Sequence, residues 1–151
     1  MIVLITGDGS IMMNLQELQV IKHHQLPIKI FLLNNQGYLA IRNTQNSFFG
    51  GRLEASDKNS GISCPDFGKV AAAFELPYMT IKSHKGIDEV ITKALAQDGP
   101  ALVDISMSPS QPLIPKVYSL KKPDGTMDSK PMEDMYPFLD PDEMAANMKN
   151  N

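Results

Sequence analysis

Two short apolar runs, separated by a stretch with helical periodicity, constrain the fold of this chain more than any other feature. The first run covers residues 2–5 and the second covers residues 28–33. Between them, Leu15, Leu18 and Ile21 recur at the spacing of one helix face. Runs of this kind are typical of buried strands, and a helix between two such strands makes a βαβ unit with parallel strands. The sequence therefore predicts an α/β fold built on a parallel sheet.

The following segments continue the alternation of helix and strand. Asn14, with Glu17 three residues later, is expected to open the first helix as a capping box, and Pro27 is expected to end it. Residues 36–65 have no sustained period, with room for a short helix at 38–44; a loop this long is usually functional or mobile. Further elements are predicted as helices at 66–75 and 87–97 and as strands at 78–81 and 101–105. This order is that of a doubly wound, mostly parallel sheet with helices on both faces.

The character of the chain changes after Met107. Prolines become frequent, and a Pro-Asp-Gly turn occupies residues 123–125. We therefore expect a domain at 1–107 and, at 108–151, an extended Pro-rich arm over the domain surface that ends in a short helix from about residue 142 to residue 148. A disordered tail is the alternative for this arm.

Composition excludes several classes of protein. A net charge of -3 argues against a general binder of nucleic acids or anionic membranes, and no apolar run approaches the roughly 20 residues of a membrane span. The single cysteine, Cys64, cannot form an internal disulfide, so we expect a cytoplasmic protein. Because one residue precedes the first apolar run, and domains seldom begin in a central strand, we expect an N-terminally incomplete domain of a larger protein.

Polar residues follow both apolar runs. Gly-Asp-Gly-Ser occupies residues 7–10, and two asparagines occupy residues 34–35. Because neighbouring parallel strands end at one edge of a sheet, we expect Asp8 and Asn35 to face each other. Their oxygens are ligands that Mg²⁺ accepts, and the backbone N–H groups of the glycine-rich turn can hold a phosphate. A turn that only reverses the chain is the alternative, but two such turns at the same edge favour a site.

These motifs and their surroundings resemble the C-terminal thiamine diphosphate-binding domain of acetolactate synthase-like thiamine-dependent enzymes. The resemblance rests on the motifs at 7–10 and 34–35, on the Asn-Leu-Gln-Glu-Leu start of the first helix, and on the Leu-Pro-Ile-Lys-Ile entry to the second strand. It covers most of residues 2–107. It implies an enzyme of the transferase or lyase class, dependent on thiamine diphosphate and Mg²⁺, that decarboxylates 2-oxo acids and joins the product to a second carbonyl compound.

The resemblance also implies roles for individual residues. Asp8 is expected to bind Mg²⁺ through its carboxylate, Asn35 through its side-chain oxygen and Gly37 through its backbone carbonyl. The residues expected to bind the cofactor, metal ligands included, are Gly7, Asp8, Gly9, Ser10, Asn35, Gly37, Tyr38 and Leu39.

No catalytic residue is expected in this chain. In the family that the chain resembles, the activating glutamate lies in a separate pyrimidine-binding domain, which these 151 residues do not contain. We therefore expect the chain to be inactive without that domain, supplied by a longer chain or a partner chain, and to form a homo-oligomer. Two alternatives stay open: a non-catalytic module or split-gene fragment that acts through a partner chain, and an unrelated flavodoxin-like or nucleotide-binding domain.

Two other side chains carry expectations that the structure can test. Arg42 is expected at the surface, with contact to an anionic substrate as the alternative. Cys64 is expected to be a small, buried or half-exposed thiol.

Overall fold

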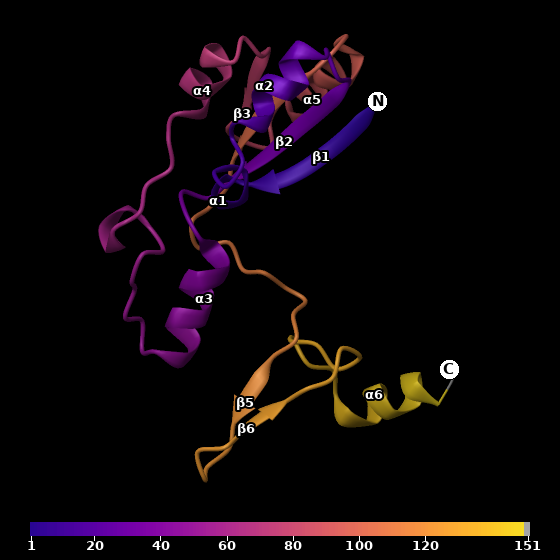
Figure 1. Cartoon of the computed structure of the whole chain (residues 1–151). Helices are drawn as coiled ribbons and strands as arrows, with labels where there is room; N and C mark the ends of the chain where they lie inside the picture. The colour runs from indigo at the N-terminus through magenta and orange to yellow at the C-terminus, as the bar shows by residue number, and fades with distance from the viewer. Residues whose placement is uncertain (150–151) are drawn as a thin grey trace. The chain divides into compact units, whose positions relative to one another are not determined.

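Four parallel strands form the sheet of the first of two compact units, which spans Met1–Gln111. The structure is a computed structural model, and it describes residues 1–149. The strands lie in the order β1-β2-β4-β3, and β1 pairs with β2 in parallel, as predicted (Figure 1). Their bounds are β1 Ile2–Gly7, β2 Ile28–Asn34, β3 Tyr78–Ile81 and β4 Ala101–Ser106. The predicted α/β sheet is therefore confirmed, and its carboxyl edge lies where β1 and β2 end.

Helices cover both faces of this sheet. The helices of the unit are α1 Asp8–Ile11, α2 Glu17–His23, α3 Leu39–Phe48, α4 Phe67–Ala73 and α5 Ile87–Ala96. On one face, Leu18 of α2 and Phe67 of α4 pack with Leu32 in one core cluster. On the other face, Ala94 of α5 packs with Phe31 and Val103. Burying one large side chain in such a core stabilises the fold by about 1.5–3 kcal/mol, so the alternating faces of β2 hold the helices in place.

The start of the first helix differs from the prediction. Asn14 forms no capping box, because the chain turns into the short α1 directly at Asp8 and α2 begins only at Glu17, with Gln16 at its N-cap and no side-chain cap. The helix also ends four residues before Pro27. Gln25 adopts a φ of 48°, and this left-handed residue, not the proline, terminates the helix.

The segment at 36–65 is more ordered than its composition predicted. The short helix expected at 38–44 extends to Phe48 as α3. A 3-10 turn, η1 Lys58–Ser60, is capped by Asp57, whose carboxylate accepts from the N–H groups of Asn59 and Ser60. Local side-chain hydrogen bonds thus order this segment, which has no apolar periodicity for sequence analysis to detect.

A buried lysine fixes the end of α5 against the sheet. Lys29 on β2 is 1% exposed, and its ammonium donates to the carbonyl oxygens of Gln97 and Gly99, the latter at 2.5 Å. Carbonyls at a helix C-terminus lack partners within the helix and favour a cation. The lysine is therefore satisfied by the backbone that it holds.

The prediction that residues 2–5 form a buried strand is wrong for this chain. β1 pairs with β2 on one side, and no residue in the described range 1–149 pairs with its other edge. Its apolar side chains are exposed as a result, with Ile2 at 59% and Ile5 at 67%. A strand with the composition of an interior strand thus lies at an open edge.

The second unit begins at Pro112, and it is not the purely extended arm that the sequence predicted. An antiparallel hairpin joins β5 (Ser119–Lys121) to β6 (Met127–Ser129) through the predicted turn at Gly125. The rings of Tyr118, Tyr136 and Phe138 pack together beside it. The expected short helix is present as α6, Pro141–Met148, capped by Asp140. Across the part of the chain that the structure describes, no helix has the length and apolar character to cross a membrane.

The role of Lys29 predicts a stability effect. Lys29→Ala removes two charge-assisted hydrogen bonds and the packing of a buried side chain, so we expect the free energy of unfolding to fall by about 2–4 kcal/mol. Urea denaturation followed by circular dichroism measures this change. Lys93→Ala, at an exposed position of α5, is the matched control and should change stability by less than about 0.5 kcal/mol. Equal effects of the two substitutions would contradict the role assigned to Lys29.

Candidate functional site

A buried carboxylate lies where β1 meets α1. Asp8 is 1% exposed, and its two oxygens accept from different backbone groups: the N–H of Gly9 at 2.8 Å and the N–H of Gly37 at 3.0 Å. The second bond crosses from the end of β1 to the turn after β2. The two strand ends that the sequence predicted to face each other therefore do so.

The Asp8 carboxylate has no cationic partner among the described residues. None of the ion pairs within residues 1–149 includes it. A carboxylate has about four lone-pair sites, and backbone donors take two of them here. A buried charge without a partner is costly, so this site is suited to a cation of matching size.

The turn after β2 places further oxygen atoms beside the carboxylate. The side-chain oxygen of Asn35 makes one long contact, 3.4 Å from an Arg42 nitrogen, which leaves it able to accept elsewhere. Gly37 is buried and follows within two residues. A carboxylate, an amide oxygen and a backbone carbonyl on adjacent segments form a hard-oxygen donor set of the kind that Mg²⁺ accepts. The residues present thus fit a magnesium ion.

Gly37 is required for steric reasons that the sequence did not indicate. Its φ of 137° lies in the region that favours glycine, and a Cβ atom there would lie 2.5 Å from the backbone oxygen of Ser56. The segment around Ser56 therefore approaches the turn too closely for any side chain at position 37.

The first turn of the site is covered by an aromatic ring. A Cβ atom on Gly9 would lie 2.3 Å from ring atoms of Tyr38, so the ring packs directly on the glycine. The Tyr38 N–H donates to the Ser56 oxygen at 2.9 Å. Ser10 is exposed at the end of the turn, and Leu39 is buried as the first residue of α3. The first N–H groups of α3 have no partner within the helix, and no side chain caps them.

Arg42 is buried, so the expectation of a surface arginine is wrong. The side chain is 5% exposed and points back from α3 to the turn, where it donates to the backbone oxygens of Asn35 at 2.9 Å and Ser56 at 3.0 Å. A signal for this position exists in the sequence: Arg42 stands four residues after Tyr38, and helical side chains point toward the N-terminal turn.

A second polar group supports the same turn from the sheet. The Asn34 amide donates to the Asp104 carboxylate at 3.1 Å, and the Tyr78 hydroxyl donates to it at 2.9 Å. The Asn34 oxygen in turn accepts from the N–H of Gln36 at 3.3 Å. Burial, with Asp104 as acceptor, raises the pKa of Tyr78, so its hydroxyl keeps its proton and acts as a donor. Sequence analysis missed Tyr78 and Asp104, because Tyr78 is the first residue of β3 and Asp104 lies within β4, so neither follows a strand end as Asp8 and Asn35 do.

The half-exposed thiol of Cys64 adjoins the site. Burial, with the nearby Asp8 carboxylate as a further cause, raises the pKa of Cys64 to about 11, and the positive charge of Arg42 acts in the opposite direction. The group is therefore an uncharged thiol at neutral pH.

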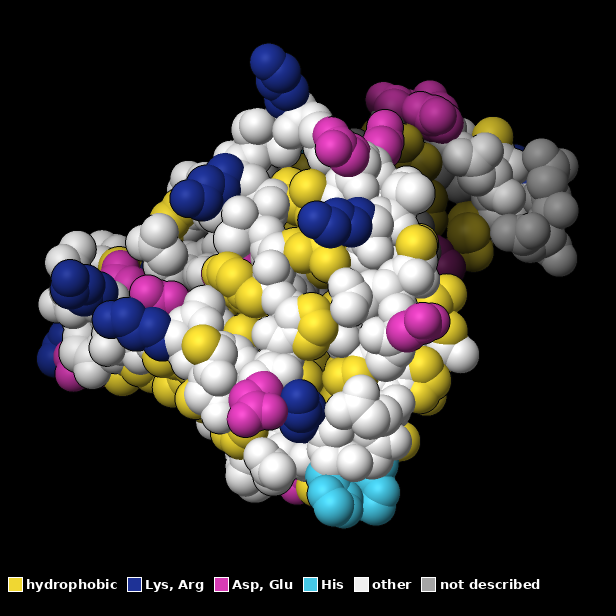
Figure 2. Space-filling model, turned by 90° about the horizontal axis from the view of Figure 1, so that it is seen from above, with side chains coloured by type: hydrophobic (Ala, Val, Ile, Leu, Met, Phe, Trp, Pro, Cys, Tyr) yellow, Lys and Arg dark blue, Asp and Glu magenta, His cyan; other side chains and the backbone are white. Residues whose placement is uncertain are grey.

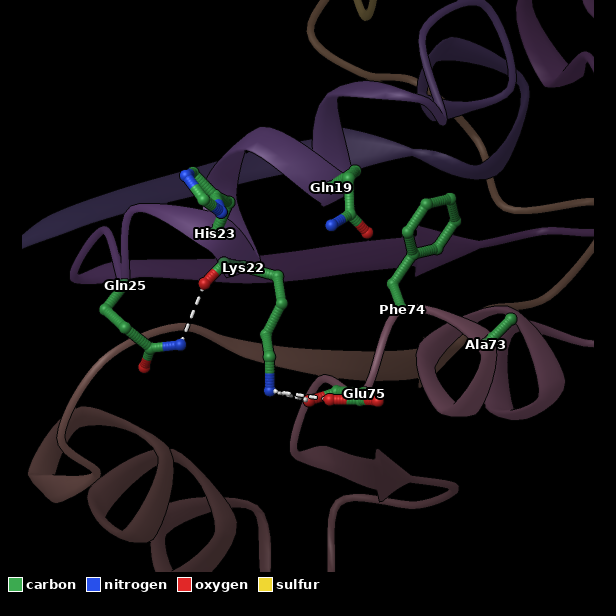
Figure 3. Close-up of a pocket in the computed structure, with 7 residues that line it drawn as sticks. All are labelled: Gln19, Lys22, His23, Gln25, Ala73, Phe74 and Glu75. Atoms are coloured by element: carbon green, nitrogen blue, oxygen red, sulfur yellow. Dashed lines mark hydrogen bonds and ion pairs between the residues drawn. The ribbon is translucent and has the colours of Figure 1, made fainter.

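A hollow elsewhere on the first unit lacks the features of a catalytic site. It holds about 320 Å³ between the C-terminal ends of α2 and α4, at the amino edge of the sheet (Figure 3). Lys22 reaches across it to the Glu75 carboxylate at 3.2 Å, and the Glu75 side chain is 78% exposed. Exposed pairs of this kind contribute about 0–1 kcal/mol.

The face in Figure 2 has acidic and basic side chains interspersed, as expected for a solvated surface.

Comparison with protein families gives a match over most of the first unit. The family described as "Thiamine pyrophosphate enzyme, C-terminal TPP binding domain" matches residues 1–105. This range contains both strand ends, the buried carboxylate and the turn that faces it.

Curated relatives point to one branch of these proteins. The chain is 34% identical over 116 residues to the acetolactate synthase large subunit of Pyropia yezoensis, covering 77% of the chain and 19% of the relative. It is 35% identical over 132 residues to the acetolactate synthase isozyme 2 large subunit of Escherichia coli (strain K12), covering 87% of the chain and 23% of that protein. Acetolactate synthase 2, chloroplastic, of Zea mays is 31% identical over 119 residues. The chain spans about a fifth of the length of these relatives.

Proposed function

Because this chain belongs to the thiamine pyrophosphate enzymes, as a C-terminal TPP-binding domain of the acetolactate synthase-like kind, we propose that it binds thiamine diphosphate through Mg²⁺ at the carboxyl edge of its sheet. The metal ligands would be the Asp8 carboxylate, the Asn35 side-chain oxygen and the Gly37 carbonyl. The observation that carries this proposal is the buried Asp8 carboxylate, which forms no ion pair with any residue in the range 1–149 and accepts a hydrogen bond from the turn of Asn35 and Gly37.

Charge explains why metal and diphosphate would bind together. A diphosphate is repelled by the Asp8 carboxylate, and a divalent cation between them reverses that repulsion. The diphosphate oxygens would accept from N–H groups at two places, the Gly7–Ser10 turn at the end of β1 and the start of α3 at Tyr38 and Leu39. The Ser10 hydroxyl, exposed at the same edge, is a further donor. Because the N–H group of Gly9 donates to the Asp8 carboxylate and that of Tyr38 donates to the Ser56 oxygen, binding at these two residues requires a local shift.

The chain's own residues would bind and orient the cofactor. When bound, thiamine diphosphate would supply a carbon nucleophile for the loss of CO₂ from a 2-oxo acid and the transfer of the remaining acyl fragment to a second carbonyl compound. No glutamate of this chain is assigned to activate it. The carboxylates of Glu17 and Glu75 lie on exposed positions of α2 and of the loop after α4. We propose that a pyrimidine-binding domain, in the same longer chain or a partner chain, supplies that glutamate.

The open edge of β1 supports association with further polypeptide. Its exposed side chains include Val3 at 49% and Ile5 at 67%, and apolar residues on an unpaired edge strand favour addition of another strand. We propose that this edge is covered in the active assembly, by the pyrimidine-binding partner or by a second copy in a homo-oligomer.

The first test is direct binding of the cofactor by the full chain. We expect isothermal titration calorimetry to show thiamine diphosphate binding with Mg²⁺ and none with EDTA, and we expect Asp8→Asn to abolish it, because a neutral amide removes the one charged ligand. Asp88→Asn, an exposed carboxylate in the first turn of α5, should bind like the wild type.

The outcomes separate the alternatives. Binding that survives EDTA or Asp8→Asn would contradict the proposed site. No binding by the wild type, with a folded far-ultraviolet spectrum, would favour the non-catalytic module. Metal-independent binding of FMN or a nucleotide instead would favour an unrelated α/β domain.

The exposed edge gives a second prediction. Val3→Lys combined with Ile5→Lys places two charges on one face of the open edge strand β1, so we expect it to weaken concentration-dependent association by at least about tenfold in sedimentation velocity. Met132→Lys, which changes a 73% exposed side chain of the second unit, is the control. A wild-type chain that stays monomeric at all concentrations would contradict self-association, and failure of β1 variants to alter association would move the interface elsewhere.

A further inference from the structure

Arg42 lies behind the turn that carries Asn35 and Gly37, and the proposed chemistry does not involve it. Its guanidinium is buried in the first unit, and both terminal nitrogens donate to protein oxygens. The acceptors, with their distances, are the backbone oxygens of Gln36 (3.4 Å), Ser56 (3.0 Å), Asn35 (2.9 Å) and Pro109 (3.0 Å) and the side-chain oxygen of Asn35 (3.4 Å).

These contacts gather three segments onto one planar group. The turn after β2, the loop at Ser56 and the stretch after β4 at Pro109 each give the guanidinium an acceptor. Arginine presents its donors in a fixed planar fork, whereas the ammonium of a lysine is a compact charge on a flexible stem and lacks that fixed geometry. Arg42 therefore fixes the position of the turn through directed hydrogen bonds, in addition to supplying a positive charge beside it.

Burial of this arginine has a cost that simple packing would avoid. The Nε atom of Arg42 is buried and has no hydrogen-bond partner among the residues that the structure describes. An apolar side chain of similar size would fill the space without an unsatisfied donor. The contacts of the terminal nitrogens with the turn are what an apolar residue could not supply.

The turn is held from its other side as well. Asn34, anchored on Asp104, accepts from the N–H of Gln36, and the Gly37 N–H donates to Asp8. Arg42 donates to the carbonyl oxygens of Asn35 and Gln36 in the same turn. The N–H groups of the turn are therefore held by Asn34 and Asp8, and its carbonyl groups are held by Arg42. Such a turn has little freedom left before any ligand arrives.

We propose that Arg42 is a positioning residue that presets residues 35–37 in the geometry that Mg²⁺ requires. This inference rests on the proposed function. Mg²⁺ demands near-octahedral ligands at about 2.0–2.1 Å, whereas Ca²⁺ accepts irregular shells at about 2.3–2.6 Å. Loosening the turn should therefore weaken Mg²⁺ more than Ca²⁺, which distinguishes positioning from general stability.

The first arm of the test needs no cofactor. Hydrogen exchange of the full chain is compared for wild type, Arg42→Lys and Arg42→Gln, with the exposed Arg52→Lys as matched control. We expect amides at 36–38 to exchange at least about tenfold faster in both Arg42 variants, while amides within β2 and β4 change by less than about twofold. Unchanged exchange at 36–38, or uniformly faster exchange throughout, would overturn the proposal.

The second arm measures metal selectivity. Thiamine diphosphate is titrated in the presence of Mg²⁺ or Ca²⁺, and the ratio of the two affinities should fall at least about fivefold in the Arg42 variants, since only Mg²⁺ demands strict geometry. Lys29→Ala, destabilised at the opposite edge of the sheet, should keep the wild-type ratio. An unchanged ratio in Arg42→Lys and Arg42→Gln would overturn the role of Arg42 alone. Wild type that binds with neither metal would contradict the proposed function and, with it, this role.

Discussion

A single hydrogen bond, from the N–H of Gly37 to the carboxylate of Asp8, joins the two strand ends on which the candidate site depends. It exists because β1 and β2 are parallel neighbours, so both end at one edge of the sheet. The acceptor of this bond, the Asp8 carboxylate, is a buried charge, and no residue in the described range 1–149 forms an ion pair with it. Every proposed role of the site follows from that uncompensated charge, because it selects a metal and the metal permits a diphosphate.

The contrast between the two ends of the first unit explains where function and stability reside. At the amino edge, Lys29 is satisfied by backbone carbonyls and needs no ligand. At the carboxyl edge, Asp8 and the uncapped start of α3 keep free capacity for charge and phosphate. Open α/β sheets bind ligands beyond the carboxyl ends of their strands for this reason. The open edge of β1 adds a second unmet requirement, which further polypeptide would satisfy.

The sequence predicted what periodicity and strand ends encode, namely the parallel pairing, the order of elements and the facing of Asp8 and the turn after β2. It failed where contacts join distant segments. Nothing local to Arg42 shows that Ser56 and Pro109 will supply acceptors, and nothing near Tyr78 points to Asp104. The exposure of Ile5 was missed for another reason: the apolar run has the composition of an interior strand, whereas within the described residues β1 pairs on one side only. Side-chain caps such as Asp57 likewise order loops without any apolar pattern.

The most direct test of the account locates the metal. Mn²⁺ binds the same carboxylate and carbonyl ligands as Mg²⁺, and it broadens nearby amide signals in NMR spectra of the isotope-labelled chain. With Mn²⁺ and thiamine diphosphate added together, we expect broadening centred on residue 8 and residues 35–37, and its loss in Asp8→Asn. Broadening centred on the hollow at Lys22 and Glu75, or spread over the second unit, would contradict the central claim that the cofactor's metal binds between the ends of β1 and β2.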